Sequence, residues 1–142
     1  MMYDPFMVQP MRDELTHIGF KELTTTEEVD EVLAKANGTT FLLVNSVCGC
    51  AAGQARPGAA LALTNDVVPE NLVTVFAGQD VEATAQARSY LKGIPPSSPS
   101  MALFKDGQLV YVLERHQIEG RSAEQVAAEL IAAFRKFCNS KG

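Results

Sequence analysis

Residues 40–44 form a nearly continuous apolar run, Thr-Phe-Leu-Leu-Val, that leads almost directly into the tripeptide Cys48-Gly49-Cys50. A run of this kind, partly β-branched and without polar alternation, is typical of a strand covered on both faces in a parallel or mixed sheet. Functional residues in such sheets gather beyond the carboxyl ends of the strands. The run therefore predicts an α/β fold and places Cys48 at the edge of the sheet where chemistry is expected.

The other elements follow from apolar periodicity and from capping residues. Apolar residues at helical spacing predict helices over residues 9–18, 26–36, 51–64 and 80–91, and a last helix after its cap at Ser122. We expect Pro10 at the first position of the first helix and a kink near Pro57 in the third. Further apolar runs predict strands over residues 72–76, 101–105 and 108–113.

Asp106-Gly107 lies between the last two predicted strands and is the strongest hairpin signal in the sequence, so these strands should pair antiparallel. The order of elements implies a single domain over residues 1–142, with a central mixed sheet, flanking helices and an N-terminal helical extension. This layout resembles that of thioredoxin-like folds.

Composition and charge narrow the classes of partner. The 142 residues carry 12 Lys and Arg against 17 Asp and Glu, and they form no basic stripe that would bind a phosphate backbone. No apolar run approaches the ~20 residues that span a bilayer, and the N-terminus lacks a signal-peptide core. We therefore expect a cytoplasmic protein with neither nucleic acid nor membrane as a partner. Cytosolic reductants keep ordinary thiols reduced, so the three cysteines do not indicate a disulfide framework.

The spacing of the cysteines favours thiol chemistry. A helix that begins near Cys50 would direct its amide groups and dipole at Cys48, which lowers the pKa of that thiol. The resulting thiolate is the nucleophile of disulfide exchange. Gly49 supplies the backbone freedom that a one-residue bridge between cysteines demands. Such a bridge would be strained and oxidising, which suits exchange, isomerisation or thiol removal better than strong reduction.

Two alternatives remain open for the cysteine pair. Both cysteines could be small core residues, because free cysteine is among the most buried residue types. The pair could also supply two thiolates to Cu(I) or Zn. The other candidate ligands, His17, His116 and Cys138, do not lie at ligand spacing to the pair, so we predict no metal site.

Five short sequence motifs of the chain together indicate a protein family. They are Tyr3-Asp4-Pro5, the run from Val44 to Gly53 that contains both cysteines, Arg56-Pro57, the run from Pro96 to Ser100, and the run from Arg115 to Gly120. In these motifs the chain closely resembles the bacilliredoxin family (YphP/YqiW type), and the likeness covers nearly its whole length.

The resemblance implies a thioredoxin-like fold and an enzyme that removes bacillithiol, a low-molecular-weight thiol, from mixed disulfides on client proteins. Cys48 would attack the bacillithiol sulfur and carry the thiol away, while Cys50 would be the resolving or modulating cysteine. It implies no bound cofactor: bacillithiol is a co-substrate, and a reductase recycles the enzyme. Protein disulfide isomerisation is a related activity attributed to the family.

Thioredoxin-like folds place a cis-proline just before the first strand of the hairpin, opposite the attacking cysteine. Pro99, preceded by Ser98, occupies that position, so we expect the Ser98-Pro99 bond to be cis. The hairpin then returns the chain to the same edge at Arg115 and His116. We expect Arg115 to bind a carboxylate of the small thiol, with a solvated charge as the alternative. His116 is a candidate proton donor or a surface residue.

Two further residues have open roles. Cys138 shares the apolar face of the last helix with Leu130 and Phe134, which favours a buried inert thiol over a redox partner. Arg56 lies near the start of the helix after the cysteines, where it either supports the thiolate electrostatically or forms a surface salt bridge.

Overall fold

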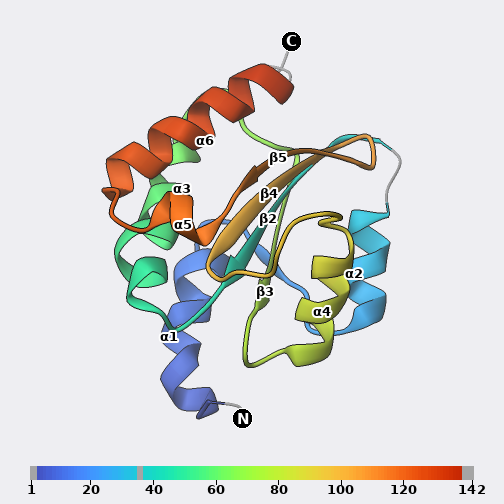
Figure 1. Ribbon diagram of the computed structural model, residues 1–142, viewed down its shortest axis with the longest axis vertical. Coiled ribbons are helices and arrows are strands. Elements are labelled where there is room, and N and C mark those ends of the chain that lie inside the picture. Colours follow the sequence, from blue (N-terminus) through green and yellow to red (C-terminus); the bar gives the residue numbers. More distant parts are fainter. Residues whose placement is uncertain (1–2, 35–36, 139–142) are drawn as a thin grey trace.

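The computed structural model describes residues 3–34 and 37–138. Its helical elements are α1 (Pro5–Thr16), α2 (Thr26–Leu33), the π-helical turn η1 (Ala51–Ala55), α3 (Arg56–Ala62), α4 (Val81–Ser89), α5 (Arg115–Ile118) and α6 (Ala123–Phe137). Its strands are β1 (Lys21–Glu22), β2 (Thr39–Asn45), β3 (Asn71–Phe76), β4 (Ser100–Lys105) and β5 (Gln108–Leu113). The sheet lies between two groups of helices (Figure 1). No helix in the described part of the chain combines the length and apolar character needed to cross a membrane.

The strands form one mixed sheet in the order β1-β3-β2-β4-β5. The central strand, β2, pairs parallel with β3 and antiparallel with β4. β5 extends the antiparallel side, and the hairpin closes through Asp106 and Gly107, whose φ angles are 52° and 79°. Two consecutive residues with positive φ are the geometry of a type I′ turn, which matches the twist of the strands. The predicted mixed sheet and hairpin are confirmed.

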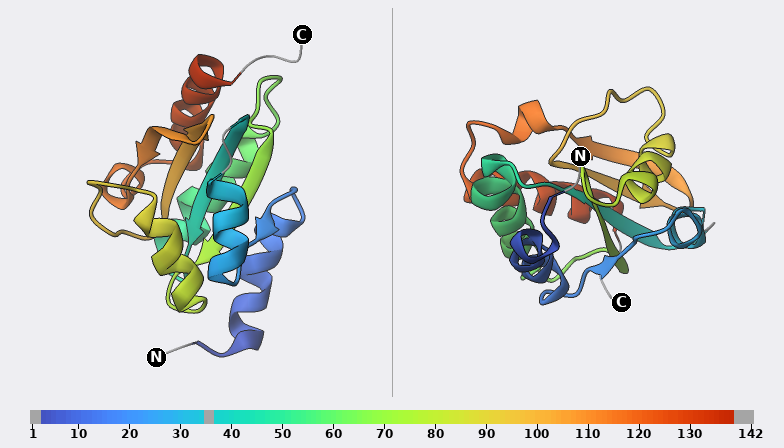
Figure 2. Two further views of the ribbon diagram at one scale, coloured as in Figure 1. Left: turned by 90° about the vertical axis from the view of Figure 1, so that its right-hand side faces the viewer. Right: turned by 90° about the horizontal axis from the view of Figure 1, so that it is seen from below.

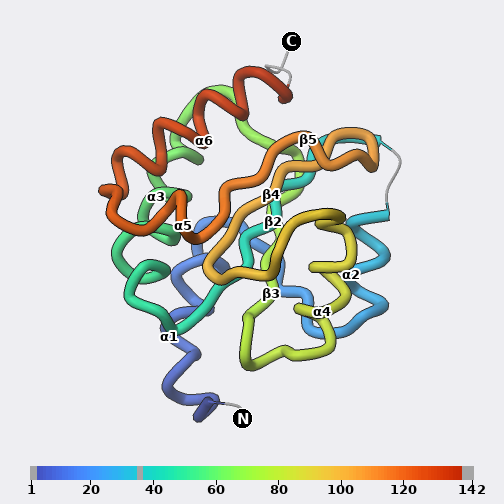
Figure 3. The backbone as a smooth tube through the Cα atoms, in the orientation of Figure 1, coloured from blue at the N-terminus to red at the C-terminus, as the bar shows by residue number. Residues whose placement is uncertain are grey.

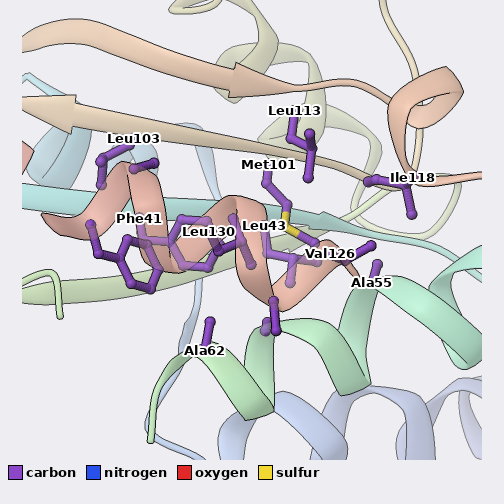
Figure 4. Packing of buried hydrophobic residues seen from close by; sticks show 14 of the residues in the cluster. Phe41, Leu43, Ala55, Ala62, Met101, Leu103, Leu113, Ile118, Val126 and Leu130 are labelled. Atoms are coloured by element: carbon purple, nitrogen blue, oxygen red, sulfur yellow. The ribbon is translucent and has the colours of Figure 1, made fainter. Parts of the chain in front are cut away.

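Both faces of β2 are buried, which explains its continuous apolar sequence. Phe41 and Leu43 belong to the cluster formed with α3 and α6, whereas Leu42 and Val44 belong to the cluster formed with α2 and α4. Side chains of a strand alternate between its faces, so one strand contributes to both clusters. Figure 2 shows the helices on either side of the sheet, and Figure 4 shows Phe41, Leu43 and Leu130 packed in the first cluster.

A glycine lets α3 approach α6 closely. A Cβ atom at Gly58 would lie 2.7 Å from Cγ1 of Val126 and 3.2 Å from the carbonyl oxygen of Ala123. These distances are shorter than van der Waals contact, so a larger residue would push the helices apart. The helix that follows the cysteines is thereby fixed against the C-terminal helix.

The first helix begins earlier than predicted. Asp4 caps α1 with its side chain, and Pro5 occupies the first helical position. Pro10 therefore lies inside the helix, and the predicted start at this residue is wrong. The physical reason is the cap: Asp4 accepts backbone hydrogen bonds far better than a glutamine such as Gln9.

The helix after the cysteines is irregular before Pro57. In the π-helical turn η1, the backbone N–H of Arg56 donates to the carbonyl oxygen of Ala51, five residues back. Pro57 lies in the first turn of α3, where its lack of an N–H removes one bond of the helical ladder. The predicted kink is thus a wide turn just before the proline.

Short elements and helix ends account for the other differences. β1 has only two residues and α5 only four, which is too little sequence for a periodic pattern, and neither was predicted. The helices α3 and α4 end at Ala62 and Ser89, two residues earlier than expected. α2 ends at Leu33, and residues 35–36 of the predicted helix lie outside the described residues.

Candidate active site

Cys48 caps the helix that follows β2. Its carbonyl oxygen accepts hydrogen bonds from the backbone N–H groups of Ala51 and Ala52, at 3.0 and 3.3 Å. Its Sγ atom accepts the backbone N–H of Cys50 at 3.2 Å. A side chain that accepts from the second N–H of a helix is the arrangement of an N-cap, so the amide groups of the first turn face this sulfur.

Arg56 fixes the corner between β2 and this helix. Its Nη1 atom donates to Oδ1 of Asn45 at 2.8 Å and to the carbonyl oxygen of Ser46 at 3.0 Å, while its Nε atom donates to Glu14 on α1 at 2.8 Å. The hydroxyl of Ser46 accepts the backbone N–H of Cys48 at 3.2 Å. The salt bridge predicted for Arg56 is present, with Glu14 as its partner, but Arg56 is 3% exposed and so does not lie on the helix surface. It is a buried structural contact.

The surroundings of Cys48 favour its thiolate. Partial burial opposes ionisation and by itself raises the pKa of the thiol. Hydrogen bonds from the backbone and thiol of Cys50 and from the backbone of Ala51, together with the positive charge of Arg115, outweigh burial. The pKa of Cys48 is therefore lowered, as expected for a nucleophilic cysteine at a helix start.

Cys50 has the opposite tendency. Burial raises the pKa of its thiol, the hydrogen bond and the charge of Cys48 and the charge of Glu119 raise it further, and Arg115 offsets only part of this. The Cys50 thiol donates to Oε2 of Glu119 over 3.8 Å. Two neighbouring thiols with opposite shifts do not ionise together, so the first proton leaves Cys48.

Cys48 opens into a cavity of about 310 Å³ at the edge of the sheet. The cavity is lined by Tyr3, Ser46, Val47, Cys48, Ala77, Gly78, Arg88, Ser98 and Arg115. These residues come from the N-terminal segment, the chain after β2 and β3, α4, the loop before β4 and the start of α5. Figure 3 traces the chain through these segments. Six parts of the sequence thus meet at one thiol.

The structure brings Ser98 and Arg115 to Cys48. The Ser98–Pro99 peptide bond is cis, as expected from the sequence, and Pro99 itself is buried. Arg115 begins α5; its Nε atom donates to Glu119 at 3.0 Å and its Nη1 atom to the carbonyl oxygen of Ser98 at 3.4 Å. Arg115 is therefore not simply a solvated charge at a strand end.

His116 and Cys138 do not line the cavity. The side chain of His116 is 73% exposed, and its Nε2 atom lies 3.7 Å from a carboxylate oxygen of Glu114. Cys138 is 6% exposed at the end of α6, where burial raises the pKa of its thiol. Cys138 is a buried thiol in the core, the interpretation that the sequence favoured.

Gly49 has no steric need to be glycine in this conformation. Its φ angle is outside the left-handed region, and a Cβ atom would meet nothing within 4 Å. Both cysteines are free thiols here. The backbone freedom predicted for Gly49 concerns a bridged form of the pair, and the dithiol places no such demand on it.

Of the lining residues that were not predicted as site residues, Arg88 and Tyr3 have the largest side chains. Arg88 follows the buried Ala87 on α4 and is itself partly buried. Arginine is rarely buried without a partner, so an arginine at such a helix position is the signal that could have indicated a site residue. Tyr3 is held by Gln79: the Tyr3 backbone N–H donates to Oε1 at 2.8 Å, and Nε2 donates to the Tyr3 carbonyl oxygen at 3.0 Å. The two residues of this contact are 76 positions apart in the sequence, so no local pattern predicts it.

The structure bears on both alternatives for the cysteine pair, a place in the core and a metal site. Cys48 and Cys50 are both partly exposed, so they are not core residues. Within residues 3–34 and 37–138, no three His, Cys, Asp or Glu side chains are grouped so that they could hold a metal ion.

Comparison with known proteins places this site in a family. A family model described as disulphide isomerase matches residues 3–138. A bacilliredoxin of Geobacillus kaustophilus is 55% identical over 142 residues, covering 97% of this chain and 98% of the relative. A bacilliredoxin of Staphylococcus aureus is 51% identical over 144 residues, covering 99% of each chain.

Solved structures agree on the fold. A thioredoxin of Fasciola hepatica is similar with a TM-score of 0.56 at 17% identity, covering 83% of this chain and 99% of the other. Mitochondrial thioredoxin 3 of Saccharomyces cerevisiae is similar with a TM-score of 0.56 at 18% identity, covering 87% and 98%. The fold is therefore that of thioredoxin. Fold and relatives together identify a thiol-disulfide oxidoreductase, and the chain belongs to the bacilliredoxin family.

Proposed function

We propose that the protein removes bacillithiol from mixed disulfides on client proteins through Cys48 and Cys50. The observation that carries the proposal is the unequal pair: the pKa of Cys48 is lowered and that of Cys50 is raised, with Cys48 facing an open cavity. Exchange needs one thiolate that attacks and a neighbour that stays protonated until it is needed.

The first step is an exchange at sulfur. The Cys48 thiolate attacks the bacillithiol sulfur of the mixed disulfide, and a new S–S bond forms between them. The old S–S bond breaks, and the client leaves as a thiolate that takes up a proton from water. No oxidant or reductant is consumed, because one disulfide has replaced another.

The second step resolves the enzyme. The Cys50 thiol gives its proton to water and attacks the Cys48 sulfur; the bond between Cys48 and bacillithiol breaks, bacillithiol leaves as a thiolate that takes up a proton from water, and a Cys48–Cys50 disulfide remains. A dithiol reductase then restores both thiols and is itself oxidised. We assign this resolving role to Cys50 because its backbone N–H lies 3.2 Å from the Cys48 sulfur and its thiol holds its proton longer.

Other residues of the edge have supporting roles in this proposal. Arg115 stabilises the Cys48 thiolate and offers a guanidinium to a carboxylate of the small thiol. Ser98 lines the cavity, and we assign to it, together with Pro99 across the cis peptide bond, the role of positioning the mixed disulfide. We place the reaction in the cytoplasm, where general reductants keep such a dithiol in its reduced, reactive form.

Disulfide isomerisation is the second candidate, and the description of the matching family model favours it. An isomerase uses the same thiolate, but its attack falls on a sulfur of the protein. The covalent intermediate then joins Cys48 to the client and carries no small thiol.

A trapping experiment tests the proposal. Cys50→Ser prevents resolution, so the reduced variant is mixed with a client that carries bacillithiol on one cysteine and is analysed by intact-mass and peptide mass spectrometry. We expect one bacillithiol on Cys48 and a free thiol on the client. Adding Cys48→Ser should abolish the transfer, whereas adding Cys138→Ser, which removes the buried thiol, serves as the matched control and should keep it.

Two outcomes would overturn the proposal. Bacillithiol that stays on the client shows that Cys48 does not attack this substrate. A mixed disulfide between Cys48 and the client shows attack at the protein sulfur and supports isomerisation. The isomerase activity would then be measured as the recovery of activity of a substrate protein whose disulfides have been scrambled.

A further inference from the structure

A second arginine lines the cavity beside Cys48. Arg88 comes from α4 and Arg115 from the start of α5. Both bind the loop that precedes the cis peptide bond: Nη2 of Arg88 donates to the carbonyl oxygen of Ser97 at 3.3 Å, and Nη1 of Arg115 donates to that of Ser98 at 3.4 Å. One loop therefore holds two cations at the same cavity.

Arg88 has no carboxylate partner among the described residues. The ion pairs of the described arginines are formed by Arg12, Arg56, Arg115 and Arg121. The Nε atom of Arg88 is buried without a hydrogen-bond partner, and the bond from Nη2 to Ser97 is the only hydrogen bond of the guanidinium within residues 3–34 and 37–138. A partly desolvated cation without a counter-charge is unfavourable, so the free protein holds a binding capacity that its described side chains do not use.

The two arginines differ in their relation to the sulfur. Arg115 is one of the groups that most lower the pKa of Cys48, and Arg88 is not one of these strongest groups. Burial lowers the pKa of Arg88 itself, in keeping with its lack of a counter-charge. Arg115 thus acts on the reacting sulfur, and Arg88 provides a charge elsewhere in the cavity.

We propose that Arg88 and Arg115 together form a binding site for the carboxylates of the small thiol whose sulfur Cys48 attacks. The inference rests on the proposed function and adds Arg88 to the residues that bind its substrate: each guanidinium binds one carboxylate of the small thiol, or both share a single carboxylate. Guanidinium and carboxylate groups pair through two parallel hydrogen bonds, which fixes orientation as well as charge.

The cavity fits such a ligand. Its volume of about 310 Å³ is at the lower end of the range for small-molecule sites. Tyr3, tethered by its two hydrogen bonds to Gln79 and in contact with Gly78, forms the wall on the side of the N-terminus. A small thiol anchored there would present its own sulfur to Cys48, so attack at that sulfur frees the client.

Substrate preference tests the site. One client cysteine is converted to a mixed disulfide with mercaptosuccinate, which has two carboxylates, or with 2-mercaptoethanol, which has none. Charge-assisted hydrogen bonds contribute about 1.5–3 kcal/mol, so we expect kcat/KM to favour mercaptosuccinate by roughly 10- to 100-fold. Arg88→Gln should reduce this ratio by a similar factor, mainly through KM, and Arg88→Lys should restore part of it.

A second measurement does not depend on turnover. Succinate, which has the carboxylates but no sulfur, should slow the alkylation of Cys48 by iodoacetamide in the wild-type protein and not in Arg88→Gln. Arg135→Gln is the matched control, because Arg135 binds Asn65 and does not line the cavity. Thermal unfolding of each variant checks that it is folded.

The outcomes separate the two claims. Turnover of both mixed disulfides with no preference, or a preference that survives Arg88→Gln, overturns the site and leaves the proposed function standing. Protection by succinate without turnover of either mixed disulfide supports the site and contradicts the proposed function. Equal alkylation with and without succinate in the wild-type protein overturns the site.

Discussion

Arg56 is the side chain on which the position of Cys48 depends most, and its replacement gives a measurable result. Arg56→Met keeps the length of the side chain and removes all its hydrogen bonds to Asn45, Ser46 and Glu14. The side chain of Arg56 is 2% exposed, so no water replaces the bonds that it makes inside the protein. The corner between β2 and the helix then loses its main support.

The expected loss of stability can be worked out bond by bond. The bond to Glu14 contributes below about 1 kcal/mol, because this carboxylate is 49% exposed and regains water. The bonds to Asn45 and Ser46 are buried and charge-assisted, at about 1.5 kcal/mol each. We therefore expect Arg56→Met to lower the free energy of unfolding by about 3 kcal/mol, or the melting temperature by roughly 10 °C.

Urea unfolding followed by circular dichroism measures this loss. Glu14→Gln is the matched control, since it removes only the exposed partner and should cost less than about 1 kcal/mol. A stability change below ~0.5 kcal/mol in Arg56→Met would refute the structural role. If that variant stayed equally stable while the pKa of Cys48 rose, Arg56 would instead act on the thiolate through its charge.

Two further substitutions test the helix contact and the second thiol. Gly58→Ala should lower the free energy of unfolding by about 1–3 kcal/mol, because its Cβ would lie 2.7 Å from Val126; Gly53→Ala, with open space around it, is the control, and equal stability of both variants would contradict the contact. Glu119→Gln should lower the pKa of Cys50 by removing a negative charge near its thiol, which the pH profile of Cys50 alkylation measures; an unchanged or raised pKa would show that Glu119 does not hold the proton.

The elements that carry their own pattern were predictable from the sequence. β2 reads as a strand buried on both faces because Phe41 and Leu43 serve one core cluster and Leu42 and Val44 the other. The hairpin follows from Asp106-Gly107 because few residue pairs accept two positive φ angles. In both cases the local residue preferences and the tertiary packing favour the same structure.

The cavity was only half predictable, because convergence in space leaves little trace in the sequence. The reactivity of the Cys48 thiol follows from its position at the start of a helix, and this position could be predicted from the sequence. Arg88 and Tyr3 reach the same cavity from distant segments, and only the folded chain brings them to Cys48. His116, which the sequence left open as a proton donor or a surface residue, has a side chain that is 73% exposed and does not line this cavity.

The order in which the two active-site thiols ionise is the most direct test of the mechanism. The rate of alkylation of Cys48 and Cys50 by iodoacetamide is measured from pH 4 to 11 (chosen to bracket the ~8.5 of an unperturbed thiol), with each site quantified by peptide mass spectrometry. The mechanism predicts that Cys48 reacts first, with a pKa below ~8.5, and that Cys50 follows with a higher pKa. Equal profiles, or a lower pKa at Cys50, would contradict attack by Cys48.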